Sequence, residues 1–380
     1  MPASPLASFQ TYFAEIEDPR VERTRRHELL DLIVIAICAV ICGADDWVDV
    51  EAWGNAKLEW LRQQGLALPN GIPSHDTFGE VFGRLKAEQF ETSFLRWVQA
   101  VMGASGRQVV AIDGKTLRGS HDRRAGKSAI HLVSAWASAN HLLLGQVQVD
   151  EKSNEITAIP ALLEMLSLGG AIVTIDAMGT QKSIARTIVD QGADYVLALK
   201  ENQGHLYEDV VATFAEAEAR QFAHVPHTYA KTTNKGHGRI ETRECWVIER
   251  LDYLEALRTA EDWAALRSLI MVRAERRLGD QVSVERRYFI SSRADPAERQ
   301  LAVIRSHWGI ENELHWCLDV AFGEDASRLR KGDGAQNFSF LRRLALSLLK
   351  REHTAKGGLK VKRHRAGWDT DYLLRVLAVQ

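Results

Sequence analysis

Residues 171–199 read AIVTIDAMGTQKSIARTIVDQGADYVLAL, and the order of elements in this segment is the clearest indication of the fold class. Branched apolar residues at 171–175 predict a strand, and a second apolar run at 195–199 predicts another. Between them, apolar residues at helical spacing predict a helix over 181–191. A strand, a helix and a second strand in this order form a crossover unit, in which the two strands lie parallel in one sheet.

Three further strands are predicted upstream, over 109–112, 130–137 and 142–149. Each run is short, rich in branched residues and bounded by turn residues, and we expect the three to pair antiparallel. A helix predicted over 155–168 joins them to the crossover unit. This order of elements predicts an α/β fold with a ribonuclease H-like mixed five-stranded sheet and flanking helices.

Residues 1–105 are predicted to form a helical N-terminal domain. Apolar spacings of three and four predict helices over 28–42, 48–64, 74–85 and 87–102, and Ser74 suits the N-cap of the third. The most apolar segment, 32–42, is about half the roughly 20 residues that span a bilayer. Acidic residues flank it, so the sequence predicts a buried helix and no membrane contact.

A second domain is predicted over 106–355. It is interrupted at about 222–293 by a β-rich insertion, with a hairpin candidate at 231–243 and a strand pair near 269–276 and 282–291. Helical periodicity resumes at Pro296 and continues through Leu318. Residues 356–380 are predicted to form a basic C-terminal tail.

Composition excludes several classes of protein. The chain has 380 residues, 46% of them hydrophobic and 26% charged, as in ordinary folded domains and unlike disordered or collagen-like chains. The net charge of −2 gives no global positive field, so a nucleic-acid partner must be sought in local patches. The four cysteines are too few and scattered for a disulfide scaffold, and no signal peptide is read, so we expect a cytoplasmic protein.

Asp113 follows the apolar run 109–112 and precedes a glycine. One interpretation is a hairpin turn, because Asp-Gly commonly joins two strands. The GKT sequence at 114–116 also matches the end of a phosphate-binding loop. The glycine required five residues before Gly114 is Val109, however, which excludes that motif.

Asp176 follows the strand predicted at 172–175 and precedes a helix. It therefore lies at the carboxyl end of a parallel strand, where open α/β sheets bind ligands, although a loop aspartate that caps a nearby helix is an alternative. Together with Asp113 it places two carboxylates on adjacent strands. A divalent cation relieves their repulsion, and oxygen-only ligands suit Mg²⁺ or Mn²⁺.

Polar residues recur every four positions in the helix predicted after Pro296. His307, Glu311, His315 and Asp319 are predicted to share one helix face. A zinc site made by the first three is less favoured, because zinc helices usually carry two histidines one turn apart. A solvated charged face is a further alternative. Glu324 and Asp325 follow as additional, less favoured metal candidates.

The chain from Arg328 to Arg365 is basic, with twelve Lys and Arg residues against Asp333 and Glu352. Such a run is usually a solvated face. In a nearly neutral protein, this concentration also makes it a candidate phosphate-binding surface.

Three motifs carry a family resemblance: AIDGK at 111–115, TIDAMGTQ at 174–181 and HWGIEN at 307–312. Together they resemble the DDE transposases of bacterial insertion sequences, most closely the H-repeat-associated group linked to Rhs elements. The likeness covers nearly the whole chain, including LPNGIPSHDTF at 68–78 and LHWCLDV at 314–320. The wider superfamily often has Tyr, Arg and Lys around its glutamate, at positions that are Ile304, His307 and Leu318 here.

The resemblance implies a ribonuclease H-like catalytic core whose three acids are catalytic and hold two Mg²⁺ or Mn²⁺ ions. Matched by motif, these acids are Asp113, Asp176 and Glu311. The implied activity is DNA transposition, in which a metal-dependent enzyme cleaves insertion-sequence ends and transfers the strands. A metal-dependent nuclease without strand transfer and a DNA-binding remnant without catalysis are the alternatives.

The implied partner is double-stranded DNA, with a homodimer on DNA as a possible assembly and the bacterial nucleoid as the place of action. The helical N-terminal domain is expected to contribute to recognition of the DNA ends. DNA contacts are further expected from six basic side chains: His307, His315, Lys360, Lys362, Arg363 and Arg365.

Overall fold

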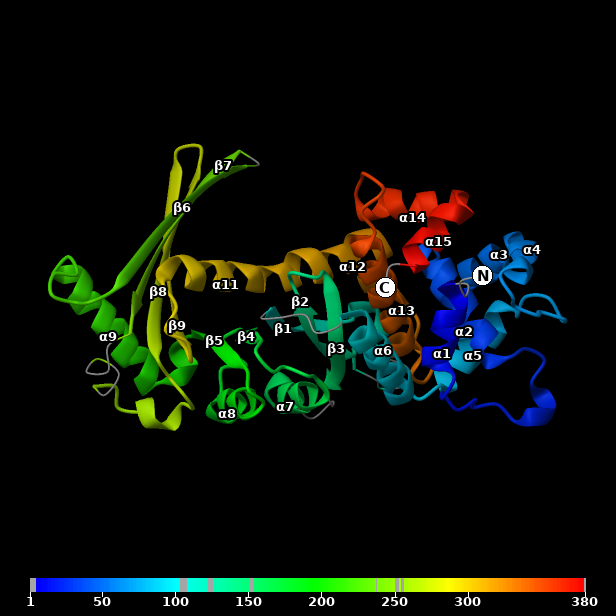
Figure 1. The fold of residues 1–380 in the computed structure, drawn as a ribbon, viewed down its shortest axis with the longest axis horizontal. Helices are drawn as coiled ribbons and strands as arrows, with labels where there is room; N and C mark the ends of the chain where they lie inside the picture. Colours follow the sequence, from blue (N-terminus) through cyan, green and yellow to red (C-terminus); the bar gives the residue numbers. More distant parts are fainter. Residues whose placement is uncertain are drawn as a thin grey trace.

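One mixed sheet of nine strands runs through the computed structural model, in the order β3-β2-β1-β4-β5-β9-β8-β7-β6 (Figure 1). The structure describes residues 5–102, 108–121, 126, 128–149, 154–236, 238–249, 253 and 256–378. The strands are β1 Val109–Thr116, β2 His131–Ala137, β3 Leu142–Val149, β4 Ile172–Ile175, β5 Asp194–Leu199, β6 Thr228–Gly236, β7 Arg239–Ile248, β8 Ser268–Leu278 and β9 Gln281–Ser291.

The five strands predicted first in the sequence are neighbours in this sheet. Strand β1 pairs antiparallel with β2, and β2 pairs antiparallel with β3. On its other side β1 pairs parallel with β4, and β4 pairs parallel with β5. The sheet does not end there, so the expectation of a five-stranded sheet is corrected to nine strands.

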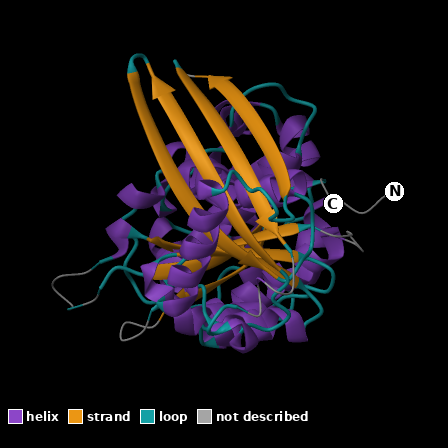
Figure 2. Cartoon of the chain, turned by 90° about the vertical axis from the view of Figure 1, so that its left-hand side faces the viewer, coloured by secondary structure: helices purple, strands orange, loops and turns teal. Residues whose placement is uncertain are grey.

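The β-rich region predicted at about 222–293 supplies the other four strands. Strand β9 pairs antiparallel with β5, which places Leu197 opposite Ile290 and covers what would otherwise be an open sheet edge. The inner halves of β8 and β9 are buried and their outer halves are exposed. The hairpins consequently project from the rest of the molecule (Figure 2).

Helices lie on both faces of the sheet. Helices α7 (Glu155–Met165) and α8 (Lys182–Asp190) pack on one face, and α9 (His205–Ala219) packs beside β9. The opposite face carries one long helix, built from α11 (Ala297–Gly309), a π-helical segment (Ile310–His315) and α12 (Trp316–Phe322). Figure 1 shows this helix running along the sheet from the insertion towards the helical end of the molecule.

The helical end contains α1 Pro5–Phe13, α2 Leu29–Ile41, α3 Trp47–Ala56, α4 Leu58–Gln63, α5 His75–Arg84 and α6 Ala87–Met102. The most apolar segment of the sequence forms the buried helix α2, as predicted. The helix predicted over 48–64 is divided at Lys57 into α3 and α4. Ser74 is the N-cap of α5, because its hydroxyl accepts a hydrogen bond from the Thr77 backbone N–H.

Helix α13 (Gly334–Arg351) connects the two ends of the molecule. It packs against α2, α5 and α6 as well as against β3 and α12. The chain then forms α14 (Leu359–Trp368) and α15 (Thr370–Leu377), which pack on α13. Most residues predicted to form a basic tail are therefore in helices that belong to the helical end.

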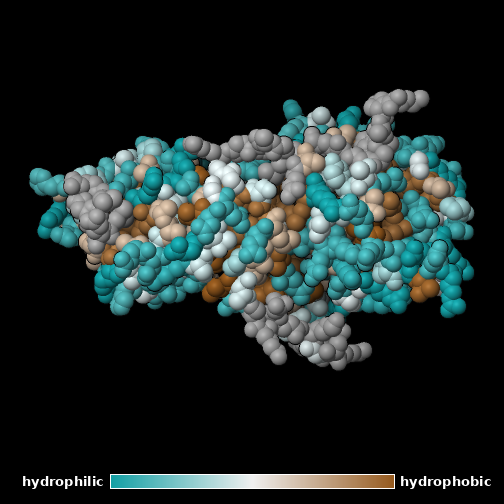
Figure 3. All heavy atoms as spheres, turned by 60° about the horizontal axis from the view of Figure 1, so that its bottom comes forward, coloured by the Kyte–Doolittle hydropathy of each residue, from teal (hydrophilic) through white to brown (hydrophobic). Residues whose placement is uncertain are grey.

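The surface of the described residues is mostly hydrophilic, with scattered apolar patches on the face shown in Figure 3. Among the described helices, none combines the length and the apolar character that a membrane span needs.

Candidate active site

Asp113 lies inside β1, four residues from its first residue, and does not form a hairpin turn. The parallel ladder pairs Ile112 of β1 with Ile175 of β4. Asp113 and Asp176 are each one residue further along, so they occupy adjacent positions on neighbouring strands. Asp113 is also opposite Ser134 of β2, which shows that β1 continues beyond the Asp-Gly pair.

Gly114 is required by close packing within β1. A Cβ atom at this position would lie 2.1 Å from Glu155 Oε1 and 2.6 Å from His131 Nε2. His131 Nε2 and Glu155 Oε1 are themselves 2.7 Å apart. The glycine therefore reflects the approach of a polar side-chain pair, and the Asp-Gly sequence misleads as a turn signal.

Asp176 follows β4 and stabilises the turn that comes after it. Its Oδ1 accepts hydrogen bonds from the backbone N–H groups of Met178 and Gly179, both at 3.1 Å. This is the local capping role that a loop aspartate often has. Because Oδ1 accepts both hydrogen bonds, they hold the carboxylate in position. Neither of the two bonds uses Oδ2.

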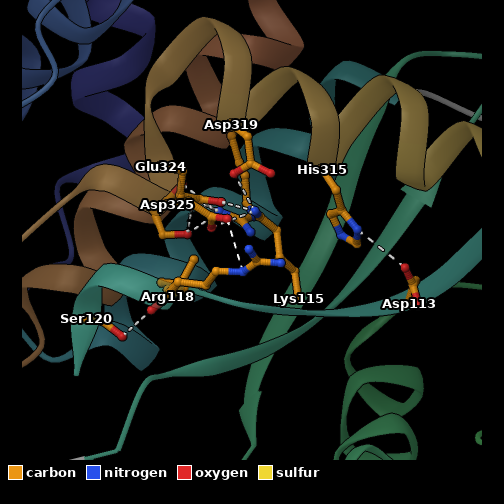
Figure 4. Close-up of polar contacts among 11 residues, drawn as sticks. Asp113, Lys115, Arg118, Ser120, His315, Asp319, Glu324 and Asp325 are labelled. Atoms are coloured by element: carbon orange, nitrogen blue, oxygen red, sulfur yellow. Dashed lines mark hydrogen bonds and ion pairs between the residues drawn. The ribbon is translucent and has the colours of Figure 1, made fainter.

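The helix face predicted from the four-residue spacing of His307, Glu311, His315 and Asp319 lies against strands β4 and β1. His307 Nδ1 lies 3.0 Å from the Thr174 hydroxyl on β4, and His315 Nδ1 lies 3.4 Å from Asp113 Oδ2 on β1. One turn later, Asp319 contacts Lys115, also on β1 (Figure 4). Glu311 lies between the two histidines, in the π-helical segment that the sequence did not predict.

The negative charges of the two aspartates act on Glu311. Removal of solvent from its carboxyl group, the charge of Asp113 and the smaller effect of Asp176 raise the pKa of Glu311, against the opposing charges of His315 and Arg287. Like-charged carboxylates raise one another's pKa when they are close. Glu311 in the π-helical segment thus interacts electrostatically with Asp113 on β1 and with Asp176, directly after β4.

The histidines around this group differ in their surroundings. Burial lowers the pKa of His307 and outweighs the charges of Asp113 and Asp176, so His307 is neutral at pH 7. His315 Nε2 is buried and makes no hydrogen bond to the described part of the chain. Both rings use Nδ1 to contact β4 or β1, which fixes the helix against the sheet.

A cavity of about 290 Å³ opens beside these residues. Asp176 and Glu311 line it together with His307 and Trp308, and Arg287 and Lys200 line it from β9 and from the residue after β5. Asp113 is not among the lining residues. Strand β9 therefore reaches the site, a feature that sequence reasoning missed because nothing in the local sequence marks Arg287.

Asp319, Glu324 and Asp325 belong to a separate, adjacent network. Lys115 Nζ lies 2.5 Å from Asp319 Oδ1 and 3.1 Å from Asp325 Oδ1, and only 9% of its side chain is exposed (Figure 4). Glu324 Oε1 accepts a hydrogen bond at 2.6 Å from the buried guanidinium of Arg343. These acids are paired with cations, which leaves Asp113, Asp176 and Glu311 as the better candidates for metal ligands.

Within the described residues, no three His, Cys, Asp or Glu side chains are already arranged to hold a metal ion. The donor chemistry of the three acids nevertheless fits a hard divalent cation, because all three offer carboxylate oxygens and the charges of the two aspartates destabilise the charge of Glu311. A cation among them would relieve that repulsion.

The four basic residues predicted to contact phosphate separate into two pairs. Lys360 and Arg365 are exposed on α14. Lys362 and Arg363 are buried and bind backbone carbonyl groups, which corrects their assignment to an exposed surface. Lys362 Nζ donates to the carbonyls of Leu349 and Glu352 at the end of α13.

Arg363 makes the equivalent contacts at the end of α2. Its guanidinium donates to the carbonyls of Val40 and Ala44 and lies 2.9 Å from Asp45 Oδ1. The last carbonyl groups of a helix have no partner within the helix, and cationic side chains commonly satisfy them. Lys362 and Arg363 thus attach α14 to the ends of α13 and α2, respectively.

Comparison with known proteins identifies the family. Residues 104–348 match the family described as "Transposase DDE domain", and residues 10–98 match the one described as "DDE_Tnp_1-associated". "Putative transposase YncI" of Escherichia coli O157:H7 is 40% identical over 376 residues, covering 98% of this chain and 95% of that protein. "H repeat-associated putative transposase YhhI" of Escherichia coli K12 is 39% identical over 379 residues, covering 98% of each chain.

A weaker similarity links the chain to a solved structure. The piggyBac transposase in a synaptic complex with hairpin DNA aligns with a TM-score of 0.47 and 10% identity, covering 98% of this chain and 81% of that one. The family matches and the two bacterial relatives are the stronger findings. The chain belongs to the DDE transposase family, alongside the H repeat-associated transposases.

Proposed function

We propose that this chain is a metal-dependent DNA transposase that cleaves the ends of its insertion sequence and joins them to target DNA. Asp113, Asp176 and Glu311 are the catalytic acids and hold two Mg²⁺ or Mn²⁺ ions. The observation that supports this proposal is that Asp113 and Asp176 directly follow the paired residues Ile112 and Ile175, and that the charges of both aspartates raise the pKa of Glu311. Double-stranded DNA is the substrate, and the proposed site of action is the bacterial nucleoid.

The first five strands of the sheet support a ribonuclease H-like core. Three antiparallel strands followed by two strands parallel to β1 have the order expected for that fold. Asp113 lies on the central strand β1, and Asp176 directly follows its neighbour β4. We propose that β6–β9 are an insertion into this core. They extend its sheet without changing the positions of the two aspartates.

Each residue of the site has a separate task in this mechanism. Asp176 is fixed by two backbone N–H groups, and Asp113 is held by His315. Neutral His307 is anchored to Thr174 and keeps the helix that carries Glu311 against the sheet. Asp113, Asp176 and Glu311 would hold two divalent ions, whose chemistry would be activation of a water molecule or a 3′-hydroxyl for in-line attack on a phosphodiester and stabilisation of the leaving oxygen.

Isosteric neutralisation of the three acids tests the proposal. The variants Asp113→Asn, Asp176→Asn and Glu311→Gln keep the side-chain size and remove an anionic ligand. We expect cleavage and strand transfer to fall by several orders of magnitude while folding and DNA binding persist. The substrate is plasmid DNA that carries the sequences flanking the gene, incubated with Mg²⁺, Mn²⁺ or EDTA.

Glu313→Gln is the matched control. Glu313 lies in the same π-helical segment, but it pairs with His141 at 2.6 Å and Lys350 at 3.5 Å and does not line the cavity. Robust Mg²⁺-dependent cleavage by the Glu311→Gln protein contradicts the assignment of the acids. Cleavage without joined products identifies a nuclease, and metal-independent DNA binding without cleavage by the wild-type protein identifies a remnant that has lost catalysis.

A further inference from the structure

Side chains of both charges line the cavity beside Glu311. The acids are Asp176, Glu285 and Glu311, and the cations are Lys200, Arg286 and Arg287. DNA that approaches three carboxylates is repelled by them. Divalent ions offset this repulsion only for the phosphate that they contact, so a neighbouring phosphate needs another cationic partner.

Arg287 is held in a fixed orientation at the cavity. Its guanidinium lies over the ring of Trp308, 4.9 Å from the ring centre, and Trp308 is 39% exposed. The Nε and Nη2 groups each donate to one carboxylate oxygen of Glu285 at 2.8 Å. A stacked, doubly hydrogen-bonded guanidinium loses little further entropy when it binds an anion.

The hydrogen bonds to Glu285 do not involve Nη1 of Arg287. The Arg287 side chain is 39% exposed, so the guanidinium remains accessible despite its two contacts. Lys200 contributes positive charge in the same place, because its charge adds to that of Arg287 in lowering the pKa of Glu285. The two cations therefore lie around one carboxylate at the rim of the cavity.

We propose that Arg287 and Lys200 bind a backbone phosphate of the DNA strand next to the one that reacts. This inference rests on the proposed function, since it assigns the strand path through the same site. Guanidinium groups suit phosphate because their planar N–H donors match its oxygens. Strand β9, which pairs directly with β5, holds Arg287 on the same sheet as Asp113 and Asp176.

A cycle that combines a protein variant with a neutralised phosphate tests the contact. A series of duplexes copies the DNA flanking the gene, and each carries one uncharged methylphosphonate at a successive position. Binding is measured in EDTA, so that neither metal nor catalysis contributes. At one position we expect the modification to weaken wild-type binding about tenfold, as for loss of one charge-assisted hydrogen bond.

The variant Arg287→Ala should weaken binding to unmodified DNA by a similar factor. On the DNA that lacks the critical charge it should cause no further loss, because the two changes remove the same contact. The Lys200→Ala variant should likewise weaken binding to unmodified DNA and cause less additional loss on DNA that is modified at that same position. Arg287→Gln retains a planar side chain over Trp308 and tests the charge if the Ala variant does not fold.

Arg277→Ala is the matched control. Arg277 also follows a glutamate by two residues, at 3.6 Å from Glu275, but it lies on the outer half of β8 and does not line the cavity. Arg277→Ala and the methylphosphonate should weaken binding independently, so their fold-changes in affinity should multiply at every position. If the fold-changes of both Arg287 variants also multiply with that of the methylphosphonate at all positions, the phosphate site is overturned. Coupling without any wild-type cleavage supports it while contradicting the proposed function.

Discussion

The buried pair between Glu324 and Arg343 predicts a large loss of stability when its acid is neutralised. The two side chains are 1% and 0% exposed, and Glu324 Oε1 is 2.6 Å from Arg343 Nη1. In the variant Glu324→Gln the guanidinium stays buried without its counter-charge. Removing one partner of a buried pair costs about 3–5 kcal/mol, which is a large part of the roughly 5–15 kcal/mol that stabilises a typical domain.

The pH dependence of this loss has a definite sign. Burial alone raises the pKa of Glu324, but the charges of Arg343, Arg342 and Lys115 together hold it below its usual value. A carboxyl whose pKa is lowered by folding contributes stability above its unfolded pKa of about 4.3 and loses it as the pH falls through the folded pKa. The difference between wild type and Glu324→Gln should therefore shrink in acid.

Urea unfolding followed by tryptophan fluorescence measures the effect at pH 7. The control Glu313→Gln alters an acid that is 36% exposed and paired with His141 and Lys350, so its loss should stay below about 1 kcal/mol. Exchanging both partners, in Glu324→Gln with Arg343→Met, should restore much of the stability. A Glu324→Gln protein that unfolds at the wild-type urea concentration but has lost metal-dependent cleavage contradicts the stabilising role of Glu324 and makes it a metal ligand.

Three further outcomes are expected. Asp113→Asn should lower the pKa of Glu311, because it removes a negative charge that raises it, and carboxyl carbon NMR titration measures the shift. Burial raises the pKa of Glu91 to about 8, so wild-type stability should fall as the pH rises from about 4.3 to 8, and a Glu91→Gln variant should lack that slope in unfolding experiments. Lys362→Met should lower the thermal unfolding temperature without changing the salt dependence of DNA binding, whereas Lys360→Ala should flatten that dependence and leave stability unchanged.

The sequence predicted the local elements of the fold well. Strands at the two aspartates, the crossover unit and the long helix after Pro296 follow from periodicity and turn residues, which act over a few positions. The nine-stranded sheet was not predictable in this way. It depends on the pairing of Leu197 with Ile290, residues separated by most of the insertion, and neither strand carries a local signal for its partner.

The basic run shows a different limit of sequence reasoning. Composition could not distinguish Lys360 and Arg365, which are exposed, from Lys362 and Arg363, which bind carbonyl groups at helix ends. The distinction depends on the positions of α2 and α13, which create unpaired carbonyls next to α14. Only the tertiary arrangement shows which cations these carbonyls use.

The spacing of four residues from His307 to Asp319 has a structural explanation in the π-helical segment. In a regular α-helix each step of four residues rotates about 40° beyond a full turn, so three steps would separate the first and last side chains by about 120°. A π turn contains more residues per turn and reduces that drift. His307 can thus contact Thr174 on β4 while Asp319 contacts Lys115 on β1, and Glu311 is held between them. The repeat of four is therefore better explained as the pattern of a helix that contains a π turn than as that of a regular one. Glu311 lies within that turn, where the charges of Asp113 and Asp176 act on its carboxyl group.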